Sequence, residues 1–291
     1  MSAAFDEMKN NCFGNPHSRH PSSRLTHDLI EQTRAEVLRF FNTDHETYSL
    51  IFTSGATASF KLVADNFNFG QSGSFVYLRE SHTSVVGMRK RVLGAAKQIF
   101  VLPTEKAEEI FQDSIQQISE SEHLQEISET NNSLFVFPAQ CNFSGQKYPL
   151  EWIAGSQKGV LNHLSPDFLL KTDEATGNNE PSNWFCLVDA ASYVSTSQLD
   201  LAIWQPDFVA VSFYKMIGYP TGLGALIVHR RAAETLKKKS YFGGGTVQMY
   251  STSRDFHVDR PSLHERYTSL KNIFIFLYSS TWIIIGSKME P

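Results

Sequence analysis

Short apolar runs recur along the chain, and stretches of mixed polarity separate them. Branched aliphatic and aromatic residues dominate the runs, as is typical of buried strands, whereas the stretches between them place apolar side chains on one helical face. The predicted strands are 48–53, 74–78, 98–102, 133–137, 184–188, 207–215 and 225–228. The predicted helices are 26–41, 56–66, 83–93, 107–129 and 150–161. Strands that alternate with helices predict an α/β fold built on a mostly parallel sheet.

Composition and charge narrow the class of protein without changing this architecture. The chain has 291 residues, which is enough for one large domain or two modest ones. Hydrophobic residues make up 41% and charged residues 19%, as in ordinary globular proteins. The formal net charge of -4 gives no sign of a basic surface, so no nucleic-acid partner is expected.

The cysteines Cys12, Cys141 and Cys186 are scattered and odd in number. Their spacing predicts neither a disulfide framework nor a zinc site, and no metal is expected. Free thiols suit a reducing compartment and the first residues carry no signal-peptide pattern, so a cytoplasmic location is expected. The apolar stretch 273–285 is shorter than the roughly 20 residues of a membrane span, so no membrane partner is expected.

Small or polar residues follow several predicted strands, which is where the ligands of α/β sheets bind. Strand 48–53 leads into Ser54-Gly-Ala-Thr57, whose small residues let backbone N–H groups face a phosphate. A plain helix cap by Ser54 or Thr57 is the alternative. His82 follows strand 74–78, and a capping or surface histidine is the alternative to a catalytic one.

Two charged residues end the later strands. Asp189 follows 184–188, and a carboxylate there needs a positive or N–H partner. Lys215 ends 207–215 beside a glycine-rich loop, and lysine is almost never buried unpaired. A helix N-terminus for phosphate, a carboxylate for a pyridine nitrogen and a lysine for a Schiff base together fit pyridoxal phosphate. No G-x-G-x-x-G fingerprint follows the first strand and no P-loop is present, which disfavours a nucleotide cofactor.

Longer stretches of the chain carry a family resemblance. They are 14–24, 51–57, 80–85, 137–145, 188–191, 211–224 and 241–246. In them the chain resembles the class V aminotransferase and cysteine desulfurase family, and within it the N-terminal domain of eukaryotic molybdenum cofactor sulfurases. The resemblance implies a fold-type I pyridoxal-phosphate transferase large domain over 13–266, with a mostly parallel sheet flanked by helices. Residues 267–291 are then a divergent apolar tail, and the family's small C-terminal subdomain is expected to be missing.

The resemblance also implies catalytic roles. Lys215 would attach to the cofactor's aldehyde and then move the substrate's Cα proton. Asp189 would pair with the pyridine nitrogen, and His82 would stack on the ring and handle protons. Ser192 stands where bacterial members often carry glutamine.

The phosphate end of the cofactor would be held by other residues. The resemblance assigns this role to the backbone of Ala56 and Thr57 together with Ser212. Tyr214 replaces the histidine of bacterial members and keeps a donor for the phosphate. Asn142 would lie near the ring hydroxyl.

The implied reaction removes sulfur from L-cysteine, giving alanine and an enzyme persulfide whose sulfur passes to the molybdenum cofactor. Family members complete their active sites across a dimer interface, so a second copy of the chain is a candidate partner. The match stops near Arg266, before the persulfide loop of the family, and Cys141 is expected to be a structural thiol. Incomplete turnover is therefore expected. The alternatives are an inactive truncated isoform that binds the cofactor weakly or pairs with a full-length subunit, and an α/β binding module without the cofactor.

Overall fold

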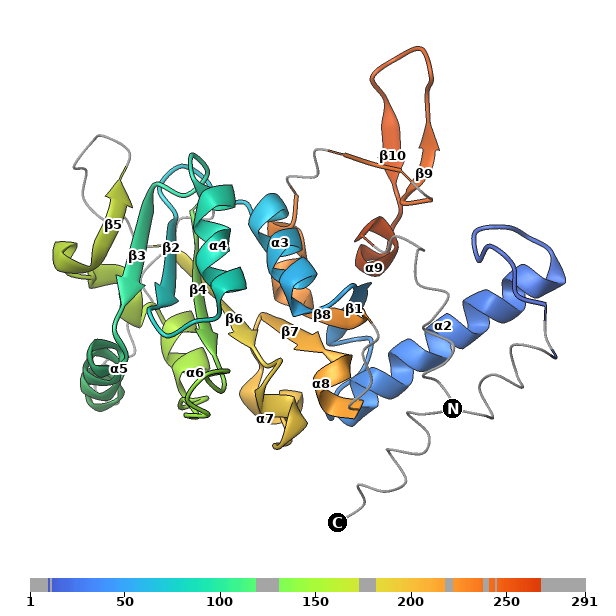
Figure 1. The fold of residues 1–291 in the computed structure, drawn as a ribbon. Coiled ribbons are helices and arrows are strands. Elements are labelled where there is room, and N and C mark those ends of the chain that lie inside the picture. Colours follow the sequence, from blue (N-terminus) through green and yellow to red (C-terminus); the bar gives the residue numbers. More distant parts are fainter. Residues whose placement is uncertain are drawn as a thin grey trace. The chain divides into compact units, whose positions relative to one another are not determined.

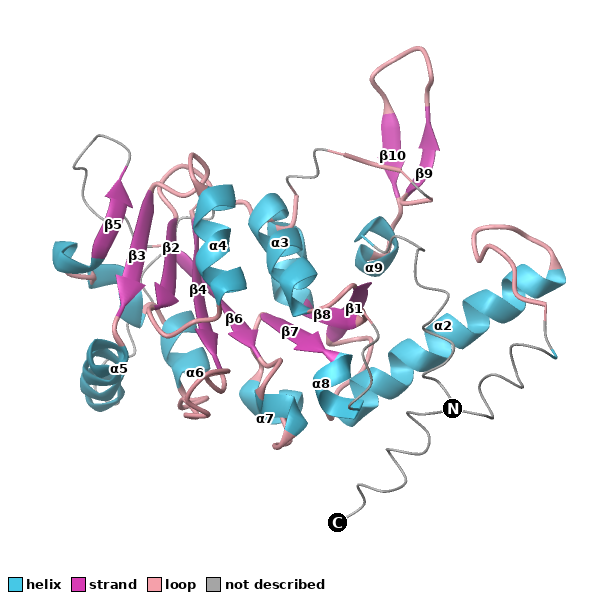
Figure 2. Ribbon diagram, in the orientation of Figure 1, coloured by secondary structure: helices cyan, strands magenta, loops and turns pink. Residues whose placement is uncertain are grey.

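The computed structural model describes residues 10, 12–118, 131–172, 182–217, 222–237, 241–243 and 245–267. The chain divides into two compact units. The first comprises Met1–Phe52 and Tyr241–Pro291, and the second comprises Thr53–Ser240. Figure 1 labels the helices and strands along the chain, and Figure 2 distinguishes them by colour.

The second unit is built on a mostly parallel sheet flanked by helices. Its strand order is β8-β7-β6-β4-β2-β3-β5. The bounds are β2 Ser74–Leu78, β3 Gln98–Leu102, β4 Asn132–Pro138, β5 Leu169–Thr172, β6 Asn183–Asp189, β7 Phe208–Ser212 and β8 Gly224–His229. Parallel pairs join β3 to β2, β2 to β4, β4 to β6 and β6 to β7, whereas β5 and β8 run antiparallel to β3 and β7. The predicted fold class is confirmed.

The central strands are mostly apolar, with polar residues at their ends, as expected for a sheet covered on both faces. Every residue of β2 and of β7 is buried. Parallel pairing also fixes which residues meet at the carboxyl ends of the strands. Pro138 at the end of β4 pairs with Asp189 at the end of β6, and Asp189 pairs with Ala210 of β7. Segments that are distant in sequence therefore begin their loops at one edge of the sheet.

Helices connect most of these strands. They are α3 Ala56–Asn66, α4 Thr83–Val92, α5 Thr104–Ile118, α6 Trp152–Gln157, α7 Leu201–Trp204 and α8 Phe213–Ile217, with 3-10 helices η1 Val160–His163, η2 Pro166–Phe168, η3 Tyr193–Ser195 and η4 Arg230–Thr235. Helices α3 and α4 pack side by side (Figure 1). Phe111 of α5 stacks on Trp152 of α6 with ring centroids 5.2 Å apart. Such a buried aromatic contact adds about 0.5–1.5 kcal/mol to the gain from area burial alone.

The first unit combines one long helix with short strands. Its elements are α2 Pro21–Phe40, β1 Tyr48–Thr53, β9 Val247–Tyr250, β10 His257–Asp259 and α9 Leu263–Tyr267, and the last residue of β1 opens the second unit. Pro21 begins α2, where its missing N–H costs nothing. Arg34 of α2 is buried, pairs with Glu31, and donates its Nε–H to the carbonyl oxygen of Leu50 at 3.0 Å.

Four predicted elements differ from the structure. The predicted helix 26–41 begins earlier, at Pro21, and ends at Phe40. The predicted helix 150–161 is interrupted, because Gly159 adopts a left-handed conformation with φ of +83° between α6 and η1. The predicted strand 207–215 ends at Ser212, and Lys215 lies on α8 instead. The predicted helix 107–129 begins earlier, at Thr104, and residues 119–130 lie outside the described part of the chain.

The described part of the chain contains no helix that is long and apolar enough to cross a membrane. Residues 268–291 lie outside that part, and with them most of the predicted tail. The predicted boundary between 13–266 and 267–291 therefore stays a prediction.

Candidate active site

One pocket of the second unit gathers every residue that the sequence and the resemblance single out for the cofactor. Its lining includes Ala56, Thr57, His82, Asn142, Asp189, Ser192, Ser212, Tyr214 and Lys215. The elements that supply them are the start of α3, the ends of β6 and β7, helix α8, and the loops after β2, β4 and β6. This is the carboxyl edge of the parallel strands, where α/β sheets bind their ligands.

The N-terminus of α3 forms one end of the pocket. The residue before the helix is Gly55, and no side chain caps the helix there, so the alternative of a plain cap by Ser54 or Thr57 is wrong. The backbone N–H of Ala56 donates to the hydroxyl oxygen of Ser212 at 2.9 Å. The other N–H groups of the first turn and the partial positive charge of the helix N-terminus together attract an anion.

Glycine is required where α3 meets the sheet. Gly55 has φ of +134°, a conformation that residues with a side chain rarely adopt. A Cβ on Gly224 of β8 would lie 2.6 Å from the Cα of Gly55 and would also overlap the carbonyl oxygen of Val211. The small residues at both positions let the first turn of α3 approach β7 and β8 closely enough for Ala56 to reach Ser212.

His82 both caps α4 and lines the pocket. Its Nδ1 accepts a hydrogen bond from the backbone N–H of Ser84 at 3.2 Å. Because Nδ1 is the acceptor, the hydrogen-bond pattern assigns the ring proton of the neutral form to Nε2. The capping alternative and the pocket position are therefore both true of this residue. The cap orients the imidazole and leaves Nε2 as its free donor.

Asp189 is the buried anion of the pocket, with 7% of its surface exposed. Its Oδ1 accepts the N–H of Ala191 at 3.1 Å. Burial raises the pKa of this carboxyl, and the backbone hydrogen bond from Ala191 together with the electrostatic interactions of His82 and Lys215 opposes the rise. Among the described residues, no cation forms a salt bridge with Asp189. A protonated ring nitrogen would supply the missing positive partner.

Lys215 is held by an amide rather than by a carboxylate. Its Nζ donates to Oδ1 of Asn142 at 2.6 Å. Lys215 occupies the short helix α8 directly after β7, and its neighbour Tyr214 is 44% exposed. The strand, the turn of α8 and the loop after β4 thus bring the amine to the same pocket as Asp189.

Four lining residues escaped the sequence analysis: Phe60, Pro138, Gln140 and Ala191. Phe60 lies one helical turn after Ala56, so helical spacing alone could have placed it on the same side of α3. Gln140 lies two positions before Asn142, the spacing that puts side chains of an extended segment on one side. Both signals require knowing beforehand which neighbour faces the ligand.

These residues fit pyridoxal phosphate in three independent respects. The N-terminus of α3, with the hydroxyl of Ser212 beside it, suits the phosphate, and the buried Asp189 suits the ring nitrogen. Lys215 is the amine required for covalent attachment, and it lines the same pocket. The site therefore has an acceptor or donor for each polar end of this cofactor.

Comparison with known proteins agrees with this chemistry. The family model described as aminotransferase class-V matches residues 2–140 and 175–268. Molybdenum cofactor sulfurase 3 from Aedes aegypti is 47% identical over 260 residues, which cover 89% of this chain and 30% of that protein. Molybdenum cofactor sulfurase from Homo sapiens is 44% identical over 267 residues, covering 90% of this chain and 28% of that protein. The chain thus spans less than a third of the length of these relatives.

Solved structures share the fold at low sequence identity. A complex of the cystine C-S lyase C-DES with cysteine persulfide has a TM-score of 0.69 at 14% identity and covers 99% of this chain and 68% of its own. The cysteine desulfurase CsdA from Escherichia coli has a TM-score of 0.68 at 17% identity, and the match covers 99% of this chain and 65% of that one. Pyridoxal phosphate, the predicted cofactor, is the one that this family uses. The predicted resemblance is confirmed, and the chain belongs to the class V aminotransferase family.

Proposed function

We propose that this chain is the pyridoxal-phosphate domain of a protein that removes sulfur from L-cysteine and passes it to the molybdenum cofactor. The observation that carries the proposal is the convergence of Lys215, Asp189 and His82 with the N-terminus of α3 in one pocket. The names of the relatives, which are 44% to 47% identical to this chain, support the choice of L-cysteine as substrate and the molybdenum cofactor as acceptor.

Pyridoxal phosphate, when bound, supplies an aldehyde for covalent attachment and a ring that draws electrons away from the substrate's Cα. Asp189 would hold the positive charge on the ring nitrogen. Its burial makes that pairing strong, because a carboxylate in a low-dielectric site interacts with a cation more strongly than one in water. Without a cation at that point, Asp189 is drawn toward its protonated form.

At the opposite end, the N-terminus of α3 and the hydroxyls of Ser212 and Thr57 would bind the phosphate. Thr57 Oγ1 lies 2.8 Å from the hydroxyl of Ser84, which links the first turns of α3 and α4. Two helix starts are thereby tied together at the anion site. Tyr214 is the exposed phenol at the pocket and would add a further donor.

Lys215 and His82 would move protons. The amine of Lys215 would form the covalent link to the cofactor and, once displaced by L-cysteine, would take the proton from the substrate's Cα. Asn142 would keep Nζ in position, since its amide oxygen already accepts from it at 2.6 Å. His82 would present Nε2 to the pocket because Nδ1 is engaged by Ser84.

The test is covalent labelling followed by turnover. The purified chain is incubated with pyridoxal phosphate, fixed with borohydride and digested, and peptide mass spectrometry should find the label on Lys215. Lys215→Ala should lose the label and any release of alanine from L-cysteine. Lys147→Ala is the matched control, because Lys147 donates to Ser197 at 2.7 Å and does not line the pocket.

Labelling and turnover separate the proposal from its alternatives. Label on Lys215 with alanine release supports a cysteine desulfurase. Label without alanine release supports the inactive, cofactor-binding isoform. If the Lys215→Ala variant and the unaltered chain are labelled equally, none of the label depends on Lys215. That result would contradict the assignment of the site and favour a binding module that has lost the cofactor.

A further inference from the structure

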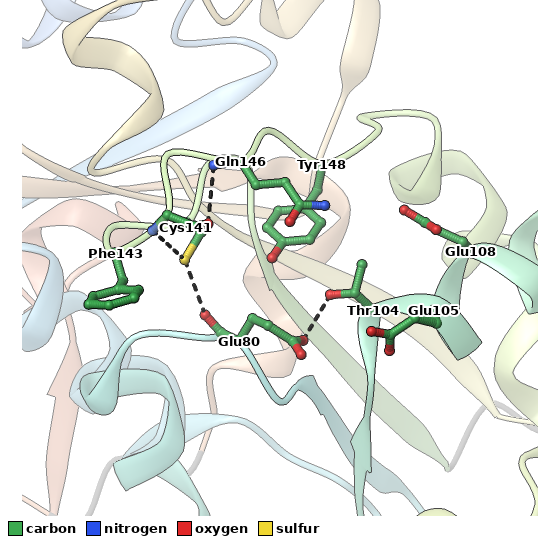
Figure 3. A pocket seen from close by; sticks show the side chains of 9 residues that line it. Glu80, Thr104, Glu105, Glu108, Cys141, Phe143, Gln146 and Tyr148 are labelled. Carbon is green, nitrogen blue, oxygen red and sulfur yellow. Dashed lines mark hydrogen bonds between the residues drawn. The ribbon is translucent and has the colours of Figure 1, made fainter.

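A second pocket of the same unit lies around Cys141 (Figure 3). Its lining is Glu80, Thr104, Glu105, Glu108, Cys141, Phe143, Ser144, Gln146 and Tyr148. None of these residues lines the pocket of Lys215. The two pockets are nevertheless adjacent in the chain, because Asn142 belongs to one and Cys141 to the other.

Cys141 faces this second pocket as a polarised thiol. It is 7% exposed, and its Sγ accepts the backbone N–H of Ser144 at 3.5 Å and, as a thiol, donates to the carbonyl oxygen of Glu80 at 3.9 Å. Burial pushes the pKa of the thiol upward, but hydrogen bonds from Ser144 and Phe143 outweigh burial and leave the pKa below its ordinary value. The burial of Cys141 is what the sequence analysis expected of a structural thiol. The hydrogen bonds to its sulfur instead favour the thiolate, which is the reactive form.

Tyr148 supplies the second polar group of the pocket. The side chain is 3% exposed, and its hydroxyl has no hydrogen-bond partner of normal geometry in the described part of the chain. Thr104 is the neighbouring hydroxyl that influences the pKa of this phenol, and it donates its own hydrogen bond to Glu80 at 2.8 Å. In Figure 3 the phenol points into the space beside Glu80 and Thr104. A buried donor without a partner destabilises the fold, and a ligand that accepts its hydrogen bond would remove this cost.

The charge of the lining selects among ligands. Glu80, Glu105 and Glu108 contribute carboxylates. Arg79 lies 3.0 Å from Glu80 and 3.7 Å from Glu105, and it offsets only part of this charge. An anionic ligand is therefore repelled from the pocket, while a neutral or cationic one is accepted or attracted.

We propose that Cys141 is a covalent modification site for small neutral or cationic disulfides. The thiolate of Cys141 attacks one sulfur of the disulfide, and a new S–S bond forms as the old one breaks. The electron pair leaves on the second sulfur, which takes a proton from solvent. The N–H of Ser144 holds the attacking sulfur, and the hydroxyl of Tyr148 donates a hydrogen bond to the sulfur that leaves.

The other two cysteines are internal references. Cys12 is exposed and lies outside any acidic pocket of the described residues. Cys186 is fully buried, and burial raises the pKa of its thiol. Modification of Cys186 would therefore report unfolding, whereas modification of Cys12 gives the rate and charge preference of an ordinary surface thiol.

The experiment compares three disulfide probes of similar size: cystamine, hydroxyethyl disulfide and dithiodiglycolate, which are cationic, neutral and anionic. The folded chain is treated with each, quenched with acid and mapped by peptide mass spectrometry. At Cys141 the ratio of cystamine to dithiodiglycolate rates should exceed the same ratio at Cys12 by about tenfold. Joint Glu105→Gln and Glu108→Gln substitution should return the ratio to that of Cys12 without exposing Cys186.

Two further variants test the thiol and the phenol separately. Ser144→Ala should move the pH midpoint of Cys141 modification upward, because it removes the Ser144 hydroxyl, which lowers the pKa of the thiol, and keeps the backbone N–H. Glu80 and Tyr148, the titratable groups that act on Cys141, stay in place in this variant. Tyr148→Phe should slow exchange about fivefold, the effect of one lost hydrogen bond, without moving the midpoint. The proposal is overturned if Cys141 reacts no faster than Cys186 in the folded chain, or if its charge preference equals that of Cys12.

Discussion

The side-chain amine of Lys215 donates a hydrogen bond to the amide oxygen of Asn142 at 2.6 Å, although the two residues are 73 positions apart. Lys215 lies on α8 after β7, and Asn142 lies in the loop after β4. A neutral amide fixes the position of Nζ, whereas a carboxylate would also hold it firmly as an ammonium ion. An amine must lose its proton before it attacks an aldehyde, and this loss is easier beside a neutral amide than beside a carboxylate.

Asn142→Asp should therefore change the pH dependence of covalent labelling. The substitution keeps the size and the acceptor but adds a negative charge beside Nζ. Labelling of Lys215 by pyridoxal phosphate at neutral pH should fall about tenfold and recover as the pH is raised, since a nearby opposite charge favours the protonated amine. The measurement is the borohydride-fixed label against pH. Asn142→Ala is the control: it should lower labelling at every pH and leave the midpoint in place. Equal midpoints in the two variants would refute the role of the amide.

Asp189→Asn should separate stability from cofactor binding. Burial raises the pKa of Asp189 above its unfolded value, so the folded protein binds more protons than the unfolded one between the two values. Stability therefore falls as the pH rises through that window, and the unliganded protein carries this penalty at neutral pH. Asparagine is never charged and removes the penalty.

The unliganded Asp189→Asn chain should accordingly melt at a higher temperature than the parent at neutral pH, and the difference should vanish in acid below the unfolded pKa. Its labelling by pyridoxal phosphate should fall, because the partner of the ring nitrogen is gone. Melting curves of both proteins across pH, with and without cofactor, provide the measurement. A lower melting temperature at neutral pH without cofactor would show that Asp189 already has an adequate partner in the protein.

The sequence predicted the parts of the site that depend on local patterns. Asp189 stands out because it follows an apolar run, and the sheet is buried on both faces as such runs require. The end of β7 was misplaced because Phe213 and Tyr214 look like strand residues, while the chain turns into α8 after Ser212. Local apolarity does not distinguish a strand from a short helix beside the same core.

Features that depend on the path of the chain could not be predicted. The lowered pKa of Cys141 depends on the hydroxyl and the backbone N–H of Ser144, which a turn brings to the sulfur. The close approach of Gly55 and Gly224 joins segments that are far apart in sequence. The short strands β5, β9 and β10 were missed because they lack a long alternating pattern.

Arg231→Gln should destabilise the second unit. Asp207 is fully buried directly before β7, and it accepts from Nη2 of Arg231 at 2.7 Å and from the N–H of Cys186 at 2.8 Å. Removing the guanidinium leaves a buried carboxylate without its cation. The free energy of unfolding should fall by about 2–3 kcal/mol, less than for a fully buried pair, because the side chain of Arg231 is 44% exposed.

Urea denaturation measures this change, and Arg91→Gln is the matched control. Arg91 pairs with Asp65 at 3.4 Å, and both side chains are partly exposed. Loss of such a surface pair should alter the free energy of unfolding by less than about 0.5 kcal/mol. Equal effects of the two substitutions would mean that Asp207 does not depend on Arg231.

Gly224→Ala should damage both stability and the phosphate end of the site. The new Cβ would lie 2.6 Å from the Cα of Gly55 and would overlap the carbonyl oxygen of Val211, and neither backbone atom can rotate away. The expected loss is about 1–3 kcal/mol of unfolding free energy. Labelling of Lys215 by pyridoxal phosphate should weaken as well, because Gly55 precedes the first turn of α3, whose Ala56 N–H reaches Ser212.

Gly87→Ala in α4 is the control: its Cβ meets nothing within 4 Å, so it should raise stability by about 0.5–1 kcal/mol with labelling unchanged. Parental stability and labelling in the Gly224→Ala chain would show that α3 does not need this close approach.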